Sequence, residues 1–113
     1  KLDSAKIFIN KAMDAQKPVF AQGYNELAGI AHQQKDLKTA LKFYQMAHQE
    51  DMSDAGIYYN IVTVYDQLGS DLGKKLVYYQ NFLKQYPNEH PFYYETARKR
   101  ISELKEEIHF SKE

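Results

Sequence analysis

Apolar side chains recur along this chain at intervals of three and four residues, the spacing that places them on one face of an α-helix. The clearest stretch covers residues 24–52, where one apolar face ends at the charged pair of residues 35–36 and a second face follows it. Two helices joined by so short a connection fold back on each other as a hairpin. Both faces carry small residues, which favour close packing of the helices: Ala28, Ala40 and Ala47.

The same spacing predicts about six helices and therefore an all-α fold. Their expected bounds are residues 3–16, 20–34, 37–50, 55–68, 72–85 and 91–108. The candidate N-caps of the first and fourth helices are Asp3 or Ser4 and Ser53 or Asp54. Gly69 is expected to adopt the left-handed conformation that favours a helix exit, and Pro91 suits a first helical turn. Residues 110–113 are expected to fray.

The chain also resembles itself when it is shifted by one repeat length. Matching segments in the second helix of each hairpin are 35 residues apart and start at Ala5, Ala40 and Lys75. Matching tyrosines in the first helix are 34 and 35 residues apart, at Tyr24, Tyr58 and Tyr93. A small or apolar residue follows each of these tyrosines by four positions: Ala28, Val62 and Ala97.

A period of 34 residues with two antiparallel helices resembles the tetratricopeptide repeat (TPR) family. The stretch 20–52 carries most of the family's signature in Tyr24, Leu27, Ala28, Asp36, Ala40, Tyr44 and Ala47. The stretch 55–87 is looser; it fits at Tyr58, Ile61, Tyr65, Gly69, Tyr79 and Pro87. It departs at Val62, Lys75 and Phe82, and Met52 stands where the earlier repeat would normally end in proline.

The resemblance implies a single TPR domain over residues 1–113, built as a superhelix of helical hairpins, an α-solenoid. Residues 1–17 match the second helix of a repeat, so they form either a partial repeat or an N-terminal cap. TPR repeats would follow at 20–52 and 55–87, with an amphipathic capping helix at 91–110. Six tyrosines are assigned to packing between the helices: Tyr24, Tyr44, Tyr58, Tyr65, Tyr79 and Tyr93.

In function, the resemblance implies a non-catalytic protein–protein interaction module, an adaptor or scaffold that holds a peptide or helix in its concave groove. The candidate groove residues are Asn25, Gly29, His32, Gln33, Tyr59, Asn60, Thr63, Asp66, Gln67, Tyr94 and Arg98. This amide-rich surface suits hydrogen bonds to a peptide backbone, and Tyr59 and Tyr94 are expected to be exposed there and to supply most of the affinity.

Other functions of the same fold stay open. The groove residues could form a wet surface without a dedicated ligand, and the chain could be a structural segment of a longer array, a self-association module or a regulatory domain of a larger protein. One TPR subclass grips a C-terminal carboxylate with Lys, Asn and Arg. Asn60 and Arg98 match two of its positions, but Asn25 and Gly29 stand where Lys and Asn would be needed, so most of that clamp is missing.

Composition and charge narrow the remaining classes. Fifteen basic and fifteen acidic residues cancel, which argues against a nucleic-acid binder or an anionic-membrane binder. The chain has no cysteine, and its histidines are too scattered for a metal site. Asp66 has no nucleophile beside it in the pattern, and no glycine-rich phosphate loop is present, so no enzyme or cofactor is expected. Residues 98–100 are interpreted as a solvated basic face.

Overall fold

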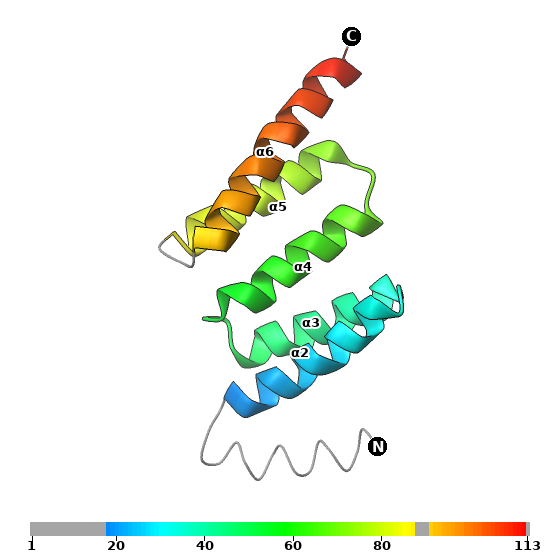
Figure 1. Ribbon diagram of the computed structural model, residues 1–113, viewed down its shortest axis with the longest axis vertical. Helices are drawn as coiled ribbons and strands as arrows, with labels where there is room; N and C mark the ends of the chain where they lie inside the picture. Colours follow the sequence, from blue (N-terminus) through cyan, green and yellow to red (C-terminus); the bar gives the residue numbers. More distant parts are fainter. Residues whose placement is uncertain (1–17, 88–90, 113) are drawn as a thin grey trace. The chain divides into compact units, whose positions relative to one another are not determined.

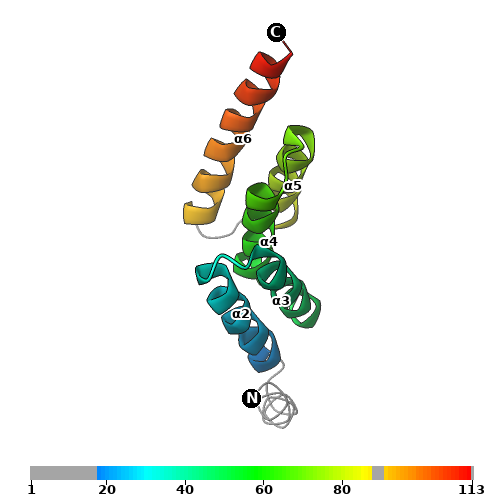
Figure 2. The ribbon, with the colours of Figure 1, turned by 90° about the vertical axis from the view of Figure 1, so that its right-hand side faces the viewer.

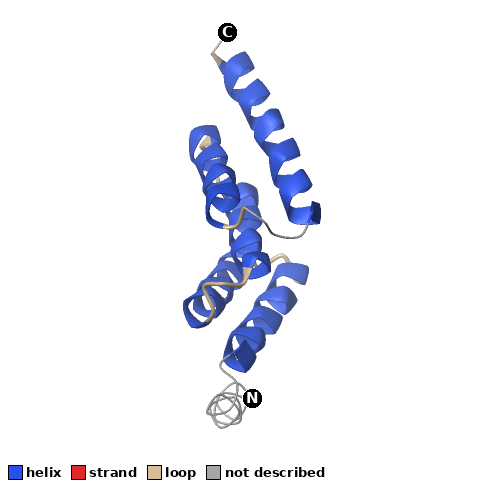
Figure 3. Cartoon of the chain, turned by 90° about the vertical axis from the view of Figure 1, so that its left-hand side faces the viewer, coloured by secondary structure: helices blue, strands red, loops and turns tan. Residues whose placement is uncertain are grey.

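A computed structural model describes residues 18–87 and 91–112 of the chain. These residues form five α-helices and no strand, which confirms the predicted all-α fold (Figure 1, Figure 3). The helices are α2 (Pro18–Gln33), α3 (Leu37–Glu50), α4 (Ala55–Leu68), α5 (Leu72–Gln85) and α6 (Pro91–Ser111). The helix predicted over residues 3–16 lies outside the described residues.

The three inner helices, α3, α4 and α5, have the predicted bounds, and the two outer ones differ. α2 begins two residues earlier than expected, at Pro18, because a proline at the first helical position lacks only an N–H that would have had no partner inside the helix. α6 continues to Ser111, so the expectation that residues 110 and 111 fray is wrong. There Ser111 Oγ donates a hydrogen bond to the carbonyl oxygen of Ile108 at 2.8 Å.

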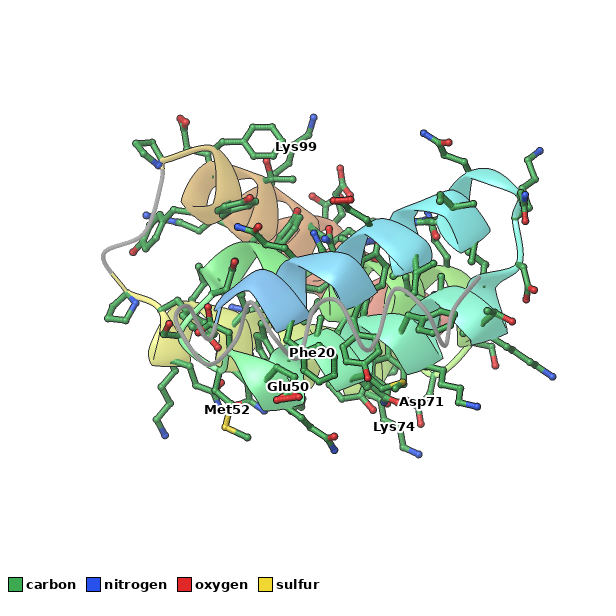
Figure 4. The ribbon with its side chains drawn as sticks, turned by 90° about the horizontal axis from the view of Figure 1, so that it is seen from below. Phe20, Glu50, Met52, Asp71, Lys74 and Lys99 are labelled. Carbon is green, nitrogen blue, oxygen red and sulfur yellow. The ribbon has the colours of Figure 1, made fainter. Side chains whose placement is uncertain are left out.

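α3 and α5 begin in the same way. The carboxylate of Asp36 accepts a hydrogen bond from the backbone N–H of Thr39 at 3.3 Å, and that of Asp71 accepts one from Lys74 at 3.1 Å. Each bond satisfies one of the N–H groups that a helix start leaves unpaired. Figure 4 shows Asp71 and Lys74 at the start of α5. Both helices have 14 residues, and each bound of α5 lies 35 positions after its counterpart in α3.

α4 is capped by one of its two predicted candidates. Asp54 accepts a hydrogen bond from the backbone N–H of Ile57 at 3.2 Å. Ser53 instead donates from Oγ to the carboxylate of Asp51 at 2.6 Å, which ties the α3–α4 turn to itself. The sequence could not separate the two candidates, because both side chains can accept the capping bond.

The left-handed residue lies at the end of α2 and not at Gly69. Among the described residues no glycine has positive φ, whereas Lys35 has φ of 63°. The N–H groups of Lys35 and Asp36 donate to the carbonyl oxygens of His32 and Ala31 at 3.0 and 2.9 Å, the pattern of a Schellman motif. Gly69 instead donates to the carbonyl of Tyr65 at 2.9 Å and prolongs the helical bonding of α4.

Replacing Lys35 with glycine should therefore stabilise the chain. Glycine removes the steric cost of the left-handed conformation and gives back part of the gain through its freer unfolded state, so the expected net gain is about 0.5–1 kcal/mol. Chemical denaturation of Lys35→Gly beside Lys38→Gly measures it. The control removes the same charge from inside α3, where glycine should destabilise. A Lys35→Gly variant that is less stable than the wild type would contradict the assigned conformation.

The chain divides into two compact units, with the boundary between Ile61 and Val62 inside α4. In the N-terminal unit, α2 and α3 form an antiparallel pair (Figure 1). A core cluster in this unit contains Phe20, Ala21, Tyr24, Ala47 and Ile57. Ala28, Ala40 and Ala47 are fully buried, as expected of small residues that let helices approach closely.

In the C-terminal unit, α6 runs back along α5 as a second antiparallel pair (Figure 2). Phe82, Ala97 and Leu104 are buried at 1, 0 and 0 % exposure. The rings of Tyr65 and Tyr78 stack with centroids 4.6 Å apart and so connect the end of α4 to α5. Over both units, the tyrosines assigned to packing are buried at Tyr24, Tyr44 and Tyr79 and half-buried at Tyr58, Tyr65 and Tyr93.

Candidate functional site

Two of the predicted groove residues meet in the N-terminal unit. Nδ2 of Asn60 on α4 donates a hydrogen bond to Oδ1 of Asn25 on α2 at 3.4 Å, and both side chains are half-buried. Within the described part of the chain, the NH₂ group of Asn25 has no partner of its own. The pair therefore joins the two helices while leaving the Asn25 donors available to a ligand.

Gly29 lies one turn after Asn25 on α2. It is half-buried, yet a Cβ built on it would meet nothing within 4 Å outside its own stretch of helix. The next residue, Ile30, is 54 % exposed, and Gln33 at the end of the helix is exposed as well. Gly29 thus leaves open space on its face of α2, while Ile30 is exposed about 100° further round the helix.

His32, also on α2, is held by the second helix of its hairpin. Its Nδ1 lies 3.4 Å from Oη of Tyr44, and the two rings meet edge to face with centroids 6.1 Å apart. Tyr44 is buried, and burial raises the pKa of its hydroxyl, so the group stays protonated at neutral pH. The contact fixes the imidazole at the α2–α3 junction.

Asp66 is the centre of the polar network in the C-terminal unit. Its carboxylate accepts hydrogen bonds from Tyr79 Oη at 2.7 Å and from Arg100 Nε and Nη2 at 2.7 and 2.9 Å, and Lys75 Nζ lies 3.3 Å away. The two bonds from Arg100 make a bidentate pair, the strongest common geometry between these groups. One carboxylate at the end of α4 is therefore bound by side chains of both α5 and α6.

The network shifts the pKa values of both main partners. Burial alone would raise the pKa of Asp66, but the hydrogen bonds from Arg100 and Tyr79 outweigh it and hold that pKa below its usual range. Hydrogen bonding to Asp66 raises the pKa of Arg100, which also binds Glu103 and Glu107 at 3.2 and 3.1 Å. At neutral pH both groups are charged, and neither is suited to transfer protons.

The assignment of residues 98–100 to a solvated basic face is therefore wrong for Arg100. Its side chain is 25 % exposed and most of its donors are bound, whereas Arg98 and Lys99 are exposed as expected. The available signal was an opposite charge 34 residues earlier in the sequence, at Asp66.

The sequence predicts that Tyr59 lies on an exposed surface, and the structure contradicts this prediction. It is buried at 8 % exposure, together with Ile57, Ile61, Val62 and Val64 of the same helix. A helix that is apolar around most of its circumference buries more than one face, so α4 has little exposed aromatic surface to offer. Tyr59 thus belongs to the core and cannot be an exposed binding residue.

The remaining candidates lie in the C-terminal unit. Thr63 is half-buried and Gln67 is exposed, both on α4. Tyr94 is half-buried on α6, with the guanidinium of Arg98 5.6 Å above its ring. This cation–π contact orders an exposed arginine beside an aromatic ring.

His48 was not singled out from the sequence; its side chain is half-buried, and its Nδ1 is the one buried side-chain N or O atom without a hydrogen-bond partner among the described residues. Its Nδ1 is buried without a hydrogen bond, and its ring lies 5.2 Å from that of Tyr58. Burial lowers the pKa of His48, and the nearby Asp51 partly opposes that effect. An isolated histidine gives no sequence signal of such burial.

Acidification should consequently weaken the N-terminal unit through His48. Because the folded pKa lies below the ordinary 6.5, the contribution of the neutral imidazole is complete above pH 6.5 and is lost as the pH falls through the folded pKa. Thermal unfolding between pH 7.5 and 5 should show a smaller decrease in Tm for His48→Phe than for the wild type. The exposed His109 supplies the control, His109→Phe; equal slopes for all three proteins would refute the assignment.

Within residues 18–87 and 91–112, no three His, Cys, Asp or Glu side chains come close enough to hold a metal ion. None of the described helices combines the length and the apolar character needed to cross a bilayer. A shallow depression of about 400 Å³ opens on α5 and is lined by Asp71, Gly73, Lys74, Val77 and Tyr78.

Comparison with known proteins adds no relative: no family model matches the chain, and no curated protein matches its sequence.

Proposed function

We propose that this chain is a tetratricopeptide-type helical array that binds a protein or peptide partner and has no catalytic role. In this proposal α2 with α3, and α4 with α5, are consecutive repeats of an α-solenoid, and α6 is the capping helix. The chain would serve as an adaptor or scaffold.

One side-chain contact that occurs twice carries the proposal. Tyr44 Oη lies 3.4 Å from His32 Nδ1, and Tyr79 Oη donates to Asp66 at 2.7 Å. Asp66 comes 34 residues after His32, and Tyr79 comes 35 residues after Tyr44, the same steps that align the first and second helices in the sequence. The two hairpins thus use one tyrosine position to bind one position of the preceding helix, which is expected when both derive from a common repeat.

The ends of α3 and α5 and three aligned buried residues also support an array of repeats. α3 and α5 share their length, an aspartate N-cap and a 35-residue offset. The aligned positions Ala28, Val62 and Ala97 are exposed by only 0, 2 and 0 %. Helices of a repeat array contact mainly their neighbours, so equivalent positions should be buried in each repeat.

The polar side chains of α2 and α4, the first helices of the two proposed repeats, favour binding over catalysis. Asp66 would be the obvious general base, but four donor atoms lie within hydrogen-bond or ion-pair distance of its carboxylate and its pKa is lowered, the opposite of what a base acting at neutral pH needs. Asn25 and Asn60 provide neutral donors and acceptors, and the chain has no net charge. These features suit a largely uncharged peptide better than a nucleic acid.

A scan of exposed positions tests the proposal. Single alanine variants at exposed residues of all five helices are measured for thermal stability and for binding of a partner captured by the intact chain. Variants that lose binding without losing stability should fall on α2, α4 and α6, the first helices of the proposed repeats. A cluster on α3 and α5 would contradict the proposal. Light scattering over a range of concentrations separates the self-association alternative, which predicts a mass that rises with concentration.

A further inference from the structure

We propose that the exposed face of α5 docks an amphipathic helix of a second partner, which places an apolar side chain beside Val77 and an acidic side chain two turns further along, beside Lys84. The surface formed by Gly73, Lys74, Val77 and Lys84 is called the α5 face below; all four residues belong to the C-terminal unit. The inference goes beyond the proposed function, because it assigns a ligand to the second helix of a hairpin and not to the first.

The first step is a difference between α3 and α5. The two helices are offset by 35 residues, so positions 38, 42, 45 and 49 of α3 align with positions 73, 77, 80 and 84 of α5. Both rows are exposed along their whole length. The α3 row begins with two lysines, whereas the α5 row has Gly73 and Val77 in their places. A single exposed aliphatic side chain is common on protein surfaces, so the exchange needs a second observation.

The second step is the hollow beside this row. The shallow depression of about 400 Å³ is lined by Asp71, Gly73, Lys74, Val77 and Tyr78. A Cβ at Gly73 would make only an ordinary contact, 3.4 Å from Oδ1 of Asp71, so alanine would fit and would strengthen the helix. Glycine instead lets another backbone come close to α5. An apolar side chain seated in the hollow would cover Val77, which is 48 % exposed.

The third step concerns charge. The 14 residues of α5 include three lysines and neither Asp nor Glu. Lys75 is bound to Asp66 at 3.3 Å. Lys74 and Lys84 are exposed, and in the part of the chain that the structure describes their ammonium groups make no ion pair. The hollow has one acidic residue, Asp71, whose carboxylate accepts the backbone N–H of Lys74 as the cap of α5. The α5 face therefore favours acidic side chains on its partner.

The fourth step decides between a helix and an extended strand. Val77 and Lys84 are seven residues apart, so they lie on one face of α5 with a rise of about 10.5 Å between them. Seven residues of a partner helix alongside cover the same distance and return to the same face. A strand advances about 3.3 Å per residue, so the same distance ends near its third residue, whose side chain points to the opposite side. The spacing thus selects a helix with an apolar and an acidic residue seven positions apart.

Selection from a display library of cross-linked helical peptides with one randomised face tests the inference on the intact chain, with the enriched peptides synthesised and measured by calorimetry. They should share an apolar residue and an Asp or Glu seven positions apart. Val77→Lys gives α5 the residue that α3 has at Lys42, and it should weaken these peptides by about tenfold or more without lowering Tm. Lys42→Val is the reciprocal control on α3 and should leave their affinity unchanged.

A charge exchange separates recognition from stability. Lys84→Glu should weaken the selected peptides by a similar factor. A peptide whose acidic residue is replaced by lysine should in turn bind Lys84→Glu more tightly than it binds the wild type. A purely structural role of Lys84 would not produce that reversal of preference.

Three results would overturn the inference: a selection that enriches no helix, enriched helices that lack the acidic residue, and helices that bind Val77→Lys as tightly as the wild type. The proposed function would stand in each case, since its partner is measured separately on α2, α4 and α6. A mass that doubles with concentration for the wild type, but not for Val77→Lys, would identify the occupant as a second copy of this chain and would overturn the assignment to another protein.

Discussion

Replacing Asp66 with alanine should destabilise the chain by about 2–4 kcal/mol. The variant leaves the bound guanidinium of Arg100, the Lys75 ammonium and the Tyr79 hydroxyl without their shared acceptor, while the side chains around it stay partly buried. Removing one partner of a buried ion pair costs more than the pair contributes, because the other charge remains desolvated. Urea denaturation of the purified chain measures the change.

Glu103→Ala supplies the matched control for Asp66. Glu103 also binds Arg100, at 3.2 Å, but its side chain is 48 % exposed, so its loss should cost no more than about 0.5 kcal/mol. A double-mutant cycle of Asp66→Ala with Arg100→Ala should show a large coupling energy. If Asp66→Ala were no more destabilising than Glu103→Ala, the Asp66 network would contribute no more to stability than an exposed ion pair.

The same carboxylate links stability to acid. The pKa of Asp66 in the folded chain lies below the ordinary 3.8, because the hydrogen bonds from Arg100 and Tyr79 outweigh the effect of burial. Its contribution is therefore present above pH 3.8 and is lost as the pH falls through the folded pKa. The free energy of unfolding of Asp66→Ala should thus fall less steeply in this range than that of the wild type.

Phe82→Ala should be the most destabilising truncation in the C-terminal unit, by about 3–5 kcal/mol. The aligned position of the preceding hairpin is an alanine, Ala47, so sequence alignment alone would judge the change harmless. The packing predicts the opposite. Phe82 is 1 % exposed, and the centroid of its ring lies 5.6 Å from that of Tyr86 and 6.2 Å from that of Tyr93, so alanine would leave a cavity.

Thermal unfolding of Phe82→Ala beside Phe110→Ala checks this expectation. Phe110 is 63 % exposed near the end of α6, and its truncation should change Tm very little. Similar Tm values for the two variants would mean that the α5–α6 pair closes the space left at position 82.

Sequence reasoning located the helices because their signals are local. Apolar spacing, the cap at Asp54, and Pro91 all act within a few residues, and the three inner helices have the expected bounds. The left-handed residue was misplaced because Lys35 carries no sign of it, whereas Gly69 does. When the surrounding structure holds a non-glycine residue in the left-handed conformation, the residue type does not reveal it.

The candidate site was harder to predict because its properties depend on residues far apart in the chain. Arg100 was assigned to water because a charge on an amphipathic helix is normally solvated, and its partner Asp66 is 34 residues away. Tyr59 was expected on an exposed surface because apolar spacing cannot say how many faces of α4 are covered. The open space at Gly29 likewise depends on which residues of other helices pack near it, and the sequence pattern does not reveal this.

The α3–α4 turn has a consequence for chemical ageing. Met52 projects from this turn at 63 % exposure (Figure 4), whereas Met46 packs against the core of the N-terminal unit. An oxidant would reach the thioether at the turn first, where a sulfoxide adds a polar group that water can solvate. Oxidation of these two methionines should thus begin at Met52, outside the helices, and the exposed thioether would consume oxidant before it reaches the half-buried Met46.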